Sequence, residues 1–374
     1  MRILISPNAM KGSMTASEFA NAIAEGLSLA NPEFELVLRP LADGGDGTSE
    51  VLVNSLKGRF VPVEVTDPLG RKVNSRFGWL EKSECAIVEM AEASGLKMLA
   101  LNELDPMVAS SRGTGELINY AIELGAKKII LGIGGSATVD GGIGMLKALG
   151  YKLLDSSGED VPEGGQGLIR VAHIDSEEVN SNLLNCEIVI ASDVVNPIFG
   201  DDGGISVYGP QKGATPQMIE DLTIGFENYL TVLEKTSGKA LHAMIGGGAA
   251  GGIAIPLIAL LNARIVNGAE TIMETLGIIN ELKTCDLVIT GEGRVDLQTA
   301  NGKGAAAVAK EAHKAGIPVL AIGGIVKPEV SSIFNGVFSI TNGPCDLDYA
   351  MKNSHSLTKS LSMELGNLIN AIYK

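Results

Sequence analysis

The stretch Cys285–Lys310, CDLVITGEGRVDLQTANGKGAAAVAK, predicts both the fold of the chain and the kind of site that it carries. Its first part, Leu287–Thr290, is a short, apolar, β-branched run that is typical of a buried strand. Gly291–Gly293 predicts a turn, because its two glycines permit positive φ and close backbone approach. A polar loop follows, and the alanine-rich Gly304–Lys310 predicts a helix. Strand, loop and helix in this order indicate an α/β fold with polar groups at the carboxyl end of a strand, where open sheets bind ligands.

The polar loop within this stretch suits an anionic ligand. Lys303 directly precedes the predicted helix, and the free N–H groups of a helix N-terminus attract anions such as phosphate. The alternative is a surface loop with solvated charges, because a single short motif is weak evidence.

Length and composition narrow the class of protein. With 374 residues the chain predicts two or more domains and a large core. The formal net charge of −15 argues against nucleic acid or an anionic membrane as the main partner, although a few lysines can still make a local anion site.

Cysteine spacing and hydropathy favour a soluble, cytoplasmic protein. The four cysteines are far apart and have neither zinc-site nor disulfide spacing, which fits a reducing compartment. Met1–Ser6 predicts a strand rather than a signal peptide. Ala249–Ala263 is the longest apolar stretch, and it is too short to span a bilayer.

Near the N-terminus the pattern predicts a strand, a helix and an acidic loop. Thr15 or Ser17 is expected to cap a helix that runs to about Leu29. Leu41–Thr48, LADGGDGT, then combines two carboxylates with three glycines and could bind a hard cation. The alternative is an ordinary Asp-Gly turn, since the spacing is not that of an EF-hand.

Two further glycine-containing loops precede predicted helices. Ser110–Gly115, SSRGTG, offers Ser, Arg and Thr donors at a helix start, which suits a carboxylate or phosphate. The alternative is an N-cap with an exposed arginine. Gly132–Ala137 matches GxGxxA after a predicted strand, so a nicotinamide-binding fold is a rival reading. Asp140 opposes that reading because it would place a carboxylate near a pyrophosphate.

The second half of the chain adds three segments of interest. Glu187–Ala191 predicts a strand that ends in Asp193, and Tyr208–Pro216 predicts a rigid loop in which Thr215 caps the next helix. Ile245–Gly252 predicts a turn lined by backbone, or alternatively the packing of two helices through small residues.

Eight motifs, in order, resemble the bacterial glycerate kinases of the two-domain α/β type (the type-1 family), over essentially the whole chain. Walker A and the protein-kinase motifs are absent. The resemblance rests on PNAMKGSMTA (Pro7–Ala16), LADGGDGT (Leu41–Thr48), SRGTGELI (Ser111–Ile118), GGSATVDGG (Gly134–Gly142), SDVVNPIFG (Ser192–Gly200), YGPQKGAT (Tyr208–Thr215), GGGAAGG (Gly246–Gly252) and DLVITGEGRVDLQT (Asp286–Thr299).

The chain departs from the family pattern at three places. The family often has PDSFKGS where this chain has Asn8, Ala9 and Met10, so Asn8 receives no catalytic role. It also often has Asn at the position of Val139, and GKAP where Gly302–Ala305 reads GKGA.

The resemblance implies ATP-dependent phosphorylation of D-glycerate, with magnesium, at O2 to give 2-phosphoglycerate and ADP. The alternative product is 3-phosphoglycerate. More distant alternatives are an NAD-dependent dehydrogenase, which titration with NADH would detect, and a non-catalytic anion-binding protein, which would release no ADP.

The resemblance and the chemistry of phosphoryl transfer suggest roles for particular residues. Asp193 is the expected base and Asp296 the second choice, with Lys11 and Lys303 as catalytic lysines. Arg112 is expected to bind the substrate carboxylate, together with Ser111, Ser136, Thr138 and Asn196. The residues expected at the nucleotide phosphates are Lys212, Gly134, Gly135, Gly291, Gly293 and Thr299. Those expected at the metal are Asp43, Asp46 and Glu292.

The expected architecture is two α/β domains with mainly parallel sheets, one inserted in the other. Residues 1–60 and 284–374 form the first domain, and residues 61–283 form the inserted one. Because the motifs come from both, the active site is expected in the cleft between the domains.

Overall fold

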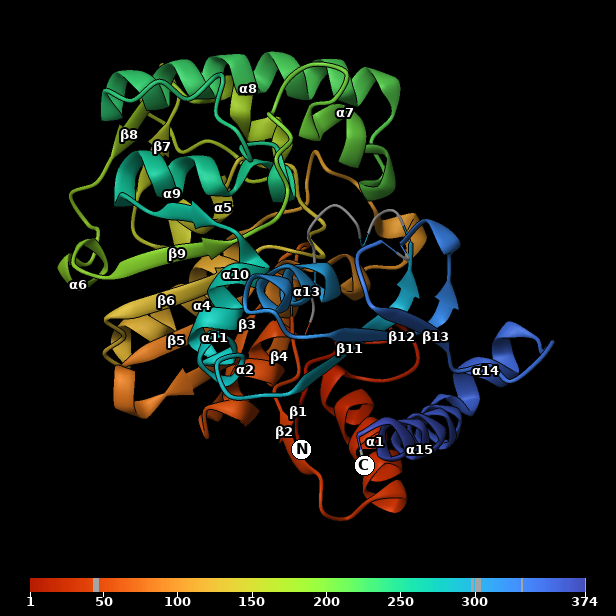
Figure 1. Ribbon diagram of the computed structural model, residues 1–374. Helices are drawn as coiled ribbons and strands as arrows, with labels where there is room; N and C mark the ends of the chain where they lie inside the picture. The colour runs from red at the N-terminus through yellow and green to blue at the C-terminus, as the bar shows by residue number, and fades with distance from the viewer. Residues whose placement is uncertain (43–46, 297–298, 300–303, 331, 374) are drawn as a thin grey trace. The chain divides into compact units, whose positions relative to one another are not determined.

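The computed structural model describes residues 1–42, 47–296, 299, 304–330 and 332–373 (Figure 1). Asp43, Asp46 and Lys303 therefore lie outside the described residues. The chain divides into two compact units, which are Met1–Asp43 with Ala269–Lys374 (unit 1) and Gly44–Gly268 (unit 2). Both units are α/β, and the pairing of strands over the two units is mostly parallel, as the sequence predicts. The boundaries expected at residues 60 and 284, and the active site expected between the domains, stay predictions.

Unit 1 contains a parallel sheet built from both ends of the chain. The described residues give the strand order β13 (Gly336–Ser339), β12 (Val319–Val326), β11 (Leu287–Val295), β1 (Arg2–Ile5) and β2 (Glu35–Leu38). The apolar, β-branched sequences of β1 and β11 form the buried centre of the sheet. Because β1 and β11 are parallel neighbours, the stretch after each of these strands begins at the same edge of the sheet.

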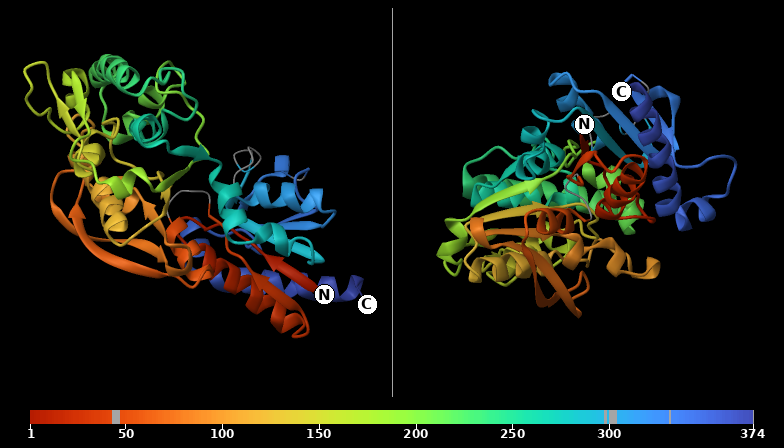
Figure 2. Two further views of the ribbon diagram at one scale, coloured as in Figure 1. Left: turned by 90° about the vertical axis from the view of Figure 1, so that its left-hand side faces the viewer. Right: turned by 60° about the horizontal axis from the view of Figure 1, so that its bottom comes forward.

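The helices of unit 1 cover this sheet and pack on one another. They are α1 (Ala16–Ala30), α10 (Gly268–Thr275, whose first residue closes unit 2), α11 (Ile278–Glu281), α13 (Ala305–Lys314), α14 (Leu347–Lys352), α15 (Ser354–Ile372) and the 3₁₀ turn η7 (Pro328–Val330). Thr15 caps α1 in a capping box with Glu18, which decides between the two expected caps. The first and last long helices, α1 and α15, lie side by side (Figures 1 and 2).

The prediction of a turn at Gly291–Gly293 is wrong. Strand β11 continues through these glycines to Val295, which pairs with Val326 of β12. A Cβ atom added at Gly291 would collide with the carbonyl oxygen of Ile322. This glycine therefore allows close approach of a neighbouring strand, and does not reverse the chain.

Unit 2 has a mixed sheet. Its order is β10 (Arg264–Val266), β9 (Glu187–Ala191), β6 (Lys128–Gly132), β5 (Cys85–Glu89), β4 (Lys72–Leu80) and β3 (Arg59–Thr66) among the described residues. The four strands from β10 to β5 are parallel, and β5, β4 and β3 form an antiparallel meander. A separate antiparallel pair is formed by β7 (Lys152–Leu154) and β8 (His173–Asp175).

The helices of unit 2 enclose a core that lies entirely within its own residues. They are α2 (Thr48–Ser55), α3 (Ala91–Ser94), α4 (Arg112–Glu123), α5 (Ile143–Ala148), α6 (Ser181–Leu184), α7 (Gly204–Tyr208), α8 (Pro216–Ser237) and α9 (Ala254–Leu261), with 3₁₀ turns η1 (Glu81–Ser83), η2 (Leu96–Met98), η3 (Leu101–Glu103), η4 (Gly165–Arg170), η5 (Pro210–Lys212) and η6 (Ala249–Gly252). Thr215 caps α8 as expected. In the described part of the chain, none of the helices has both the length and the apolar character needed to cross a membrane.

Candidate active site

In unit 1 the loop after β1 is fixed alongside the end of β11. The backbone N–H of Asn8 donates to the carbonyl of Gly291 at 2.8 Å, and a Cβ added at Gly293 would lie 3.4 Å from the Cα of Met10. Lys11 follows in this loop and is exposed. The structure therefore brings Lys11 close to the backbone of the glycine-rich segment of β11.

The same segment carries two carboxylates. Glu292 lies in β11, and Asp296 directly follows Val295, the last residue of this strand. Asp296 forms an ion pair with Arg294 (Nε to Oδ2, 2.6 Å), and its backbone N–H donates to Thr299 Oγ1 at 3.1 Å. Among the described residues no group of three or more His, Cys, Asp or Glu side chains is placed to hold a metal.

Helix α13 begins next to the same loop. Gly304, directly before the helix, has a φ of 49°, and a Cβ added there would lie 3.0 Å from Asn8 Nδ2. Asn8 is buried, and its amide lies next to Gly304, the residue that directly precedes the helix. The N-terminus of α13 thus lies beside Asn8, whose N–H is bonded to the carbonyl of Gly291. We call Lys11, Gly291, Glu292, Gly293, Asp296 and Thr299 the unit 1 cluster.

In unit 2 the loop after β6 is held at several points. The carbonyl of Gly135 accepts from the N–H of Leu96 at 2.8 Å, and the N–H of Ala137 donates to the carbonyl of Ser94 at 2.9 Å. Gly135 has a φ of 70°, which a glycine adopts without strain. Ser136, between these two anchors, therefore has a fixed backbone.

Asp140 is a buried acceptor in this loop. Its carboxylate accepts from the N–H and hydroxyl of Ser111 (2.9 and 2.7 Å) and from the N–H groups of Gly142 and Gly144 (3.1 and 3.2 Å). Burial raises the pKa of Asp140, and these hydrogen bonds oppose the increase. Ser111 is fully buried and its hydroxyl also accepts from the N–H of Met145, so its side chain is engaged within the fold.

Arg112 is the first residue of α4 and is paired within the fold. Its Nε donates to Glu163 Oε1 at 2.7 Å, and Ser110 Oγ donates to Glu163 Oε2 at 2.6 Å. The Arg112 side chain keeps 35% of its surface exposed. It can therefore meet an anion while Glu163 holds one edge of its guanidinium.

Lys212 is buried, with 2% of its surface exposed. Its ammonium donates to Ser136 Oγ and to the carbonyl oxygen of Thr138, both at 2.8 Å. Burial lowers the pKa of Lys212 to about 7, and the negative charge of Asp140 opposes the decrease. Thr138 is also fully buried, so neither side chain lies on the surface.

Asp193 follows β9 and borders a hollow of about 220 Å³. Its Oδ1 accepts from the N–H of Gly268 at 2.8 Å. The hollow is lined by Ser192, Asp193, Val194, Val195, Ile245, Gly246, Ile265, Val266 and Asn267. Asn196 lies just beyond; its amide donates to the carbonyl of Asp202 and accepts from the hydroxyl of Tyr208, so it fixes this loop.

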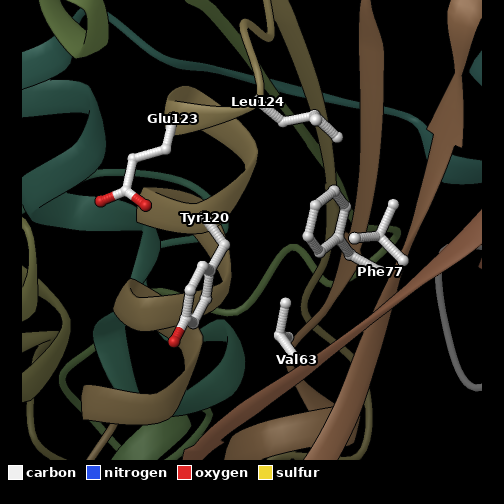
Figure 3. A pocket seen from close by; sticks show the side chains of 6 residues that line it. Val63, Phe77, Tyr120, Glu123 and Leu124 are labelled. Carbon is white, nitrogen blue, oxygen red and sulfur yellow. The ribbon is translucent and has the colours of Figure 1, made fainter.

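A second hollow, of about 280 Å³, lies between α4 and the β3–β4 pair (Figure 3). Figure 3 shows Val63, Phe77, Tyr120, Glu123 and Leu124 around it. None of the expected site residues lines this hollow.

The structure thus separates the expected residues into two groups. Lys11, Gly291, Glu292, Gly293, Asp296 and Thr299 belong to unit 1; Ser111, Arg112, Gly134, Gly135, Ser136, Thr138, Asp193, Asn196 and Lys212 belong to unit 2. Within unit 2, β6 and β9 pair in parallel, so the loop with Ser136 and the loop with Asp193 leave the same edge of the sheet.

Sequence reasoning gave no site role to three buried or paired carboxylates. Asp140 and Glu163 are described above, and Glu89 accepts from the backbone N–H groups of Gly47 and Ser49 at the start of α2. The only sequence signal for a carboxylate that accepts from loop N–H groups is an acidic residue within a glycine-rich run, as in GGSATVDGG. Of these three carboxylates, only Asp140 has this signal.

Comparisons with known proteins agree over nearly the full length. A family model described as the glycerate kinase family matches residues 3–370. A glycerate kinase of Haemophilus influenzae is 38% identical over 99% of both chains, and a glycerate 2-kinase of Escherichia coli is 41% identical over 95% of this chain and 94% of that one. A crystal structure described as glycerate kinase 2 from Salmonella typhimurium LT2 superposes with a TM-score of 0.91 at 40% identity, covering 99% of this chain and 98% of that one.

Proposed function

The chain belongs to the glycerate kinase family and is a kinase, and on this premise we propose that it transfers the γ-phosphoryl group of ATP to O2 of D-glycerate. The products are 2-phosphoglycerate and ADP. The choice of O2 is supported by the name of the Escherichia coli relative, a glycerate 2-kinase.

The observation that carries the proposal is the position of Asp193 at a small hollow. The hollow of about 220 Å³ is below the usual range for drug-sized ligands, so its size suits a molecule as small as glycerate. Asp193 Oδ1 is fixed by the N–H of Gly268, which orients the carboxylate at the end of β9. A carboxylate held in this way can accept the proton of one substrate hydroxyl.

The proposed reaction is an in-line transfer. The O2 hydroxyl loses its proton to the Asp193 carboxylate as its oxygen bonds to the γ-phosphorus, and the bond from that phosphorus to the ADP oxygen breaks. Arg112 binds the glycerate carboxylate with the exposed part of its guanidinium. Ser136 adds a hydroxyl donor from the adjacent loop, while Ser111, Thr138 and Asn196 hold these loops in shape.

The unit 1 cluster suits the phosphates of ATP. Lys11 supplies a positive charge, the backbone around Gly291 and Gly293 permits close approach, and α13 offers a helix N-terminus. Thr299 supports this segment through the N–H of Asp296. Gly134, Gly135 and Lys303 stay predicted phosphate contacts.

Magnesium fits this cluster. Mg²⁺ in kinases is usually bound by one or two carboxylates together with phosphate oxygens, and this cluster contains two carboxylates, Glu292 and Asp296. When bound there it would neutralise phosphate charge. Asp43 and Asp46 stay predicted ligands. Asp296 as an alternative base also stays a prediction.

The proposal is tested by ³¹P NMR of the product formed from ATP and D-glycerate. Phosphate on O2 couples to one carbon-bound proton and gives a doublet, whereas phosphate on O3 couples to two and gives a triplet. A triplet would assign the product as 3-phosphoglycerate. ADP release without a phosphorylated acid, or no turnover at all, would overturn the proposal.

We also propose that the enzyme works in the cytoplasm. The support is chemical: the described cysteines Cys85, Cys186, Cys285 and Cys345 are all free thiols, which suits a reducing compartment.

A further inference from the structure

Lys212 is too deeply buried for the phosphate contact that its motif suggests. Only 2% of its surface is exposed, and its ammonium is bound to Ser136 Oγ and to the Thr138 carbonyl. A buried ammonium needs such acceptors, because burial without them strongly disfavours the charged form. Both acceptors lie in the loop after β6, so Lys212 acts on that loop.

The hydrogen bond from Lys212 fixes the direction of the Ser136 hydroxyl. An ammonium has donors and no acceptor, so Ser136 Oγ must be the acceptor of this bond. The single proton of the hydroxyl then points away from Lys212. Ser136 keeps 7% of its surface exposed, whereas the neighbouring Thr138 is completely covered.

The backbone on both sides of Ser136 is held still. Gly135 accepts from Leu96 and Ala137 donates to Ser94, so the peptide groups flanking Ser136 are both bonded. The loop leaves the carboxyl end of β6, next to the loop that carries Asp193 after β9. The Ser136 hydroxyl therefore belongs to a loop at the edge of the sheet where the proposed substrate binds.

We propose that Lys212 is a positioning residue for glycerate phosphorylation: it holds the Ser136 hydroxyl as an acceptor, so that Ser136 donates its proton to the anionic substrate. The inference rests on the proposed function and adds to it a residue that never touches the substrate. It also replaces the direct phosphate contact expected for Lys212 from its motif.

The charge of Lys212 makes this arrangement sensitive to pH. The charged group that faces Lys212 in the described residues is Asp140, in the loop before α5, and Asp140 also faces the buried Tyr229 of α8. Burial brings the pKa of Lys212 to about 7. Below that pH the ammonium can only donate to Ser136. Above it the neutral amine can accept instead, and the Ser136 proton can turn inward.

A double-mutant cycle on the full-length protein tests the inference. Lys212→Met, Ser136→Ala and the double variant are compared in kcat/KM for D-glycerate. Each single variant should lose about 10–100-fold, mostly through KM for glycerate, and the double variant should lie within about threefold of Ser136→Ala. Losses that multiply in the double variant, or a rise in KM for ATP in Lys212→Met, would overturn the inference.

The pH profile gives a second readout that a purely structural role would not change. Wild-type kcat/KM for glycerate should decrease above about pH 7, and this decrease should be absent in Ser136→Ala. If Lys212→Met fails to fold, Ser136→Ala still decides, because a decrease that persists in this variant contradicts the inference.

A matched control separates Lys212 from buried lysines in general. Lys147, on α5, is 8% exposed in its side chain and bonds to Asp160 and to the carbonyl of Val161. Lys147→Met should leave KM for glycerate unchanged. If KM for glycerate rises as much in Lys147→Met as in Lys212→Met, the effect is not specific to Lys212, and the inference is wrong.

Wild-type turnover, measured first, tests the proposed function separately. If the wild type phosphorylates no glycerate, calorimetric titration with D-glycerate alone still tests the inference. D-glycerate should then bind more weakly to each single variant than to the wild type, and the double variant should bind it no more weakly than the single variants do. Losses of affinity that add in the double variant, or no binding to the wild type, would refute the role of Lys212.

Discussion

At the residue scale, Asp140 organises the buried polar centre of unit 2. Among the described residues its carboxylate accepts from four donors, namely two groups of Ser111 and the N–H groups of Gly142 and Gly144. It is also the charge that faces the buried Lys212. An acceptor surrounded only by donors has no tolerance for a donating group in its place.

Replacing Asp140 by Asn should therefore destabilise the protein although the shape is kept. The amide nitrogen must face an N–H or hydroxyl donor, and the buried Lys212 loses its counter-charge. We expect the free energy of unfolding to decrease by about 2–4 kcal/mol, measured by urea denaturation followed through Trp79 fluorescence. Asp201, which is exposed, is the control: Asp201→Asn should change the value by less than about 0.5 kcal/mol. Equal stability of the two variants would show that Asp140 is not an obligatory acceptor.

Arg112 and Glu163 form a pair whose two members should differ in function. Arg112→Ala removes the proposed carboxylate ligand and should cost about 2–4 kcal/mol of glycerate binding, a rise in KM of about 30–1000-fold with KM for ATP nearly unchanged. Glu163→Gln removes only the internal partner and should change KM for glycerate by less than about threefold. If Glu163→Gln has the larger effect of the two, Arg112 serves the fold and not the substrate.

Residue roles were only partly predictable because burial depends on the tertiary fold. The sequence located Ser136, Asp193 and Arg112 at the ends of strands or the start of a helix, since those positions follow from local patterns. It could not show that Lys212 turns inward, because a lysine in a glycine-rich loop is usually exposed. From the sequence alone, Asp140 argues only against a dinucleotide site, and its buried hydrogen bonds cannot be foreseen.

At the element scale, Glu234 of α8 ties the following loop to the helix. Its Oε1 accepts from the N–H of Leu241 at 2.6 Å and from the backbone and ring nitrogens of His242. These bonds, first that from Leu241, hold the pKa of Glu234 at about 2. A carboxylate with a pKa lowered by folding stabilises the native state only while it is ionised.

This gives a pH-dependent prediction for Glu234→Gln. The stability from Glu234 is fully present above the unfolded value of 4.5 and is lost as pH falls toward about 2. The thermal midpoint of Glu234→Gln should therefore lie below that of the wild type at about pH 7, and the difference should shrink between about pH 5 and pH 2. A difference that stays constant across this range would mean that the ionised carboxylate is not the stabilising form.

The bounds of a strand could be predicted where its apolar run covers the whole buried segment. They could not be predicted where pairing with a neighbouring strand extends the element beyond that run. Strand β9 has the expected bounds Glu187–Ala191, because its apolar run is bounded by polar residues. Strand β11 instead runs on to Val295, because β12 provides paired backbone groups as far as Val326. No local signal distinguishes a glycine that turns from a glycine that permits a close neighbour.

At the scale of the whole molecule, the two units differ in how the chain builds them. Unit 1 needs both ends of the chain, because β1 lies between β2 and β11 in one sheet. Unit 2 is continuous, and its large apolar cluster lies within residues 65–263. The sequence also predicts one domain inserted in the other, and its predicted boundary after residue 60 would assign α2 to the domain formed by both chain ends.

Residues 44–268 should therefore fold without the rest of the chain. The fragment keeps α2, which contributes the buried Val51, Leu52 and Val53, and it keeps the donors of Gly47 and Ser49 for the buried carboxylate of Glu89. Fragment 61–283, cut at the boundaries expected from sequence, loses both. We expect 44–268 to unfold cooperatively on heating, and 61–283 to melt lower or without cooperativity, since a buried carboxylate without its donors is costly.

Trp79 is the single tryptophan of the chain and is 4% exposed, so its emission reports the unfolding of unit 2 in either fragment and in the full chain. In 44–268 the emission should match that of the full chain before heating and shift to the red in one transition. Equal midpoints for the two fragments would show that α2 is dispensable and would favour the boundary at residue 60. A solvent-exposed Trp79 in fragment 44–268 would show that unit 2 cannot fold alone, because its apolar cluster would then need residues of unit 1 to exclude water.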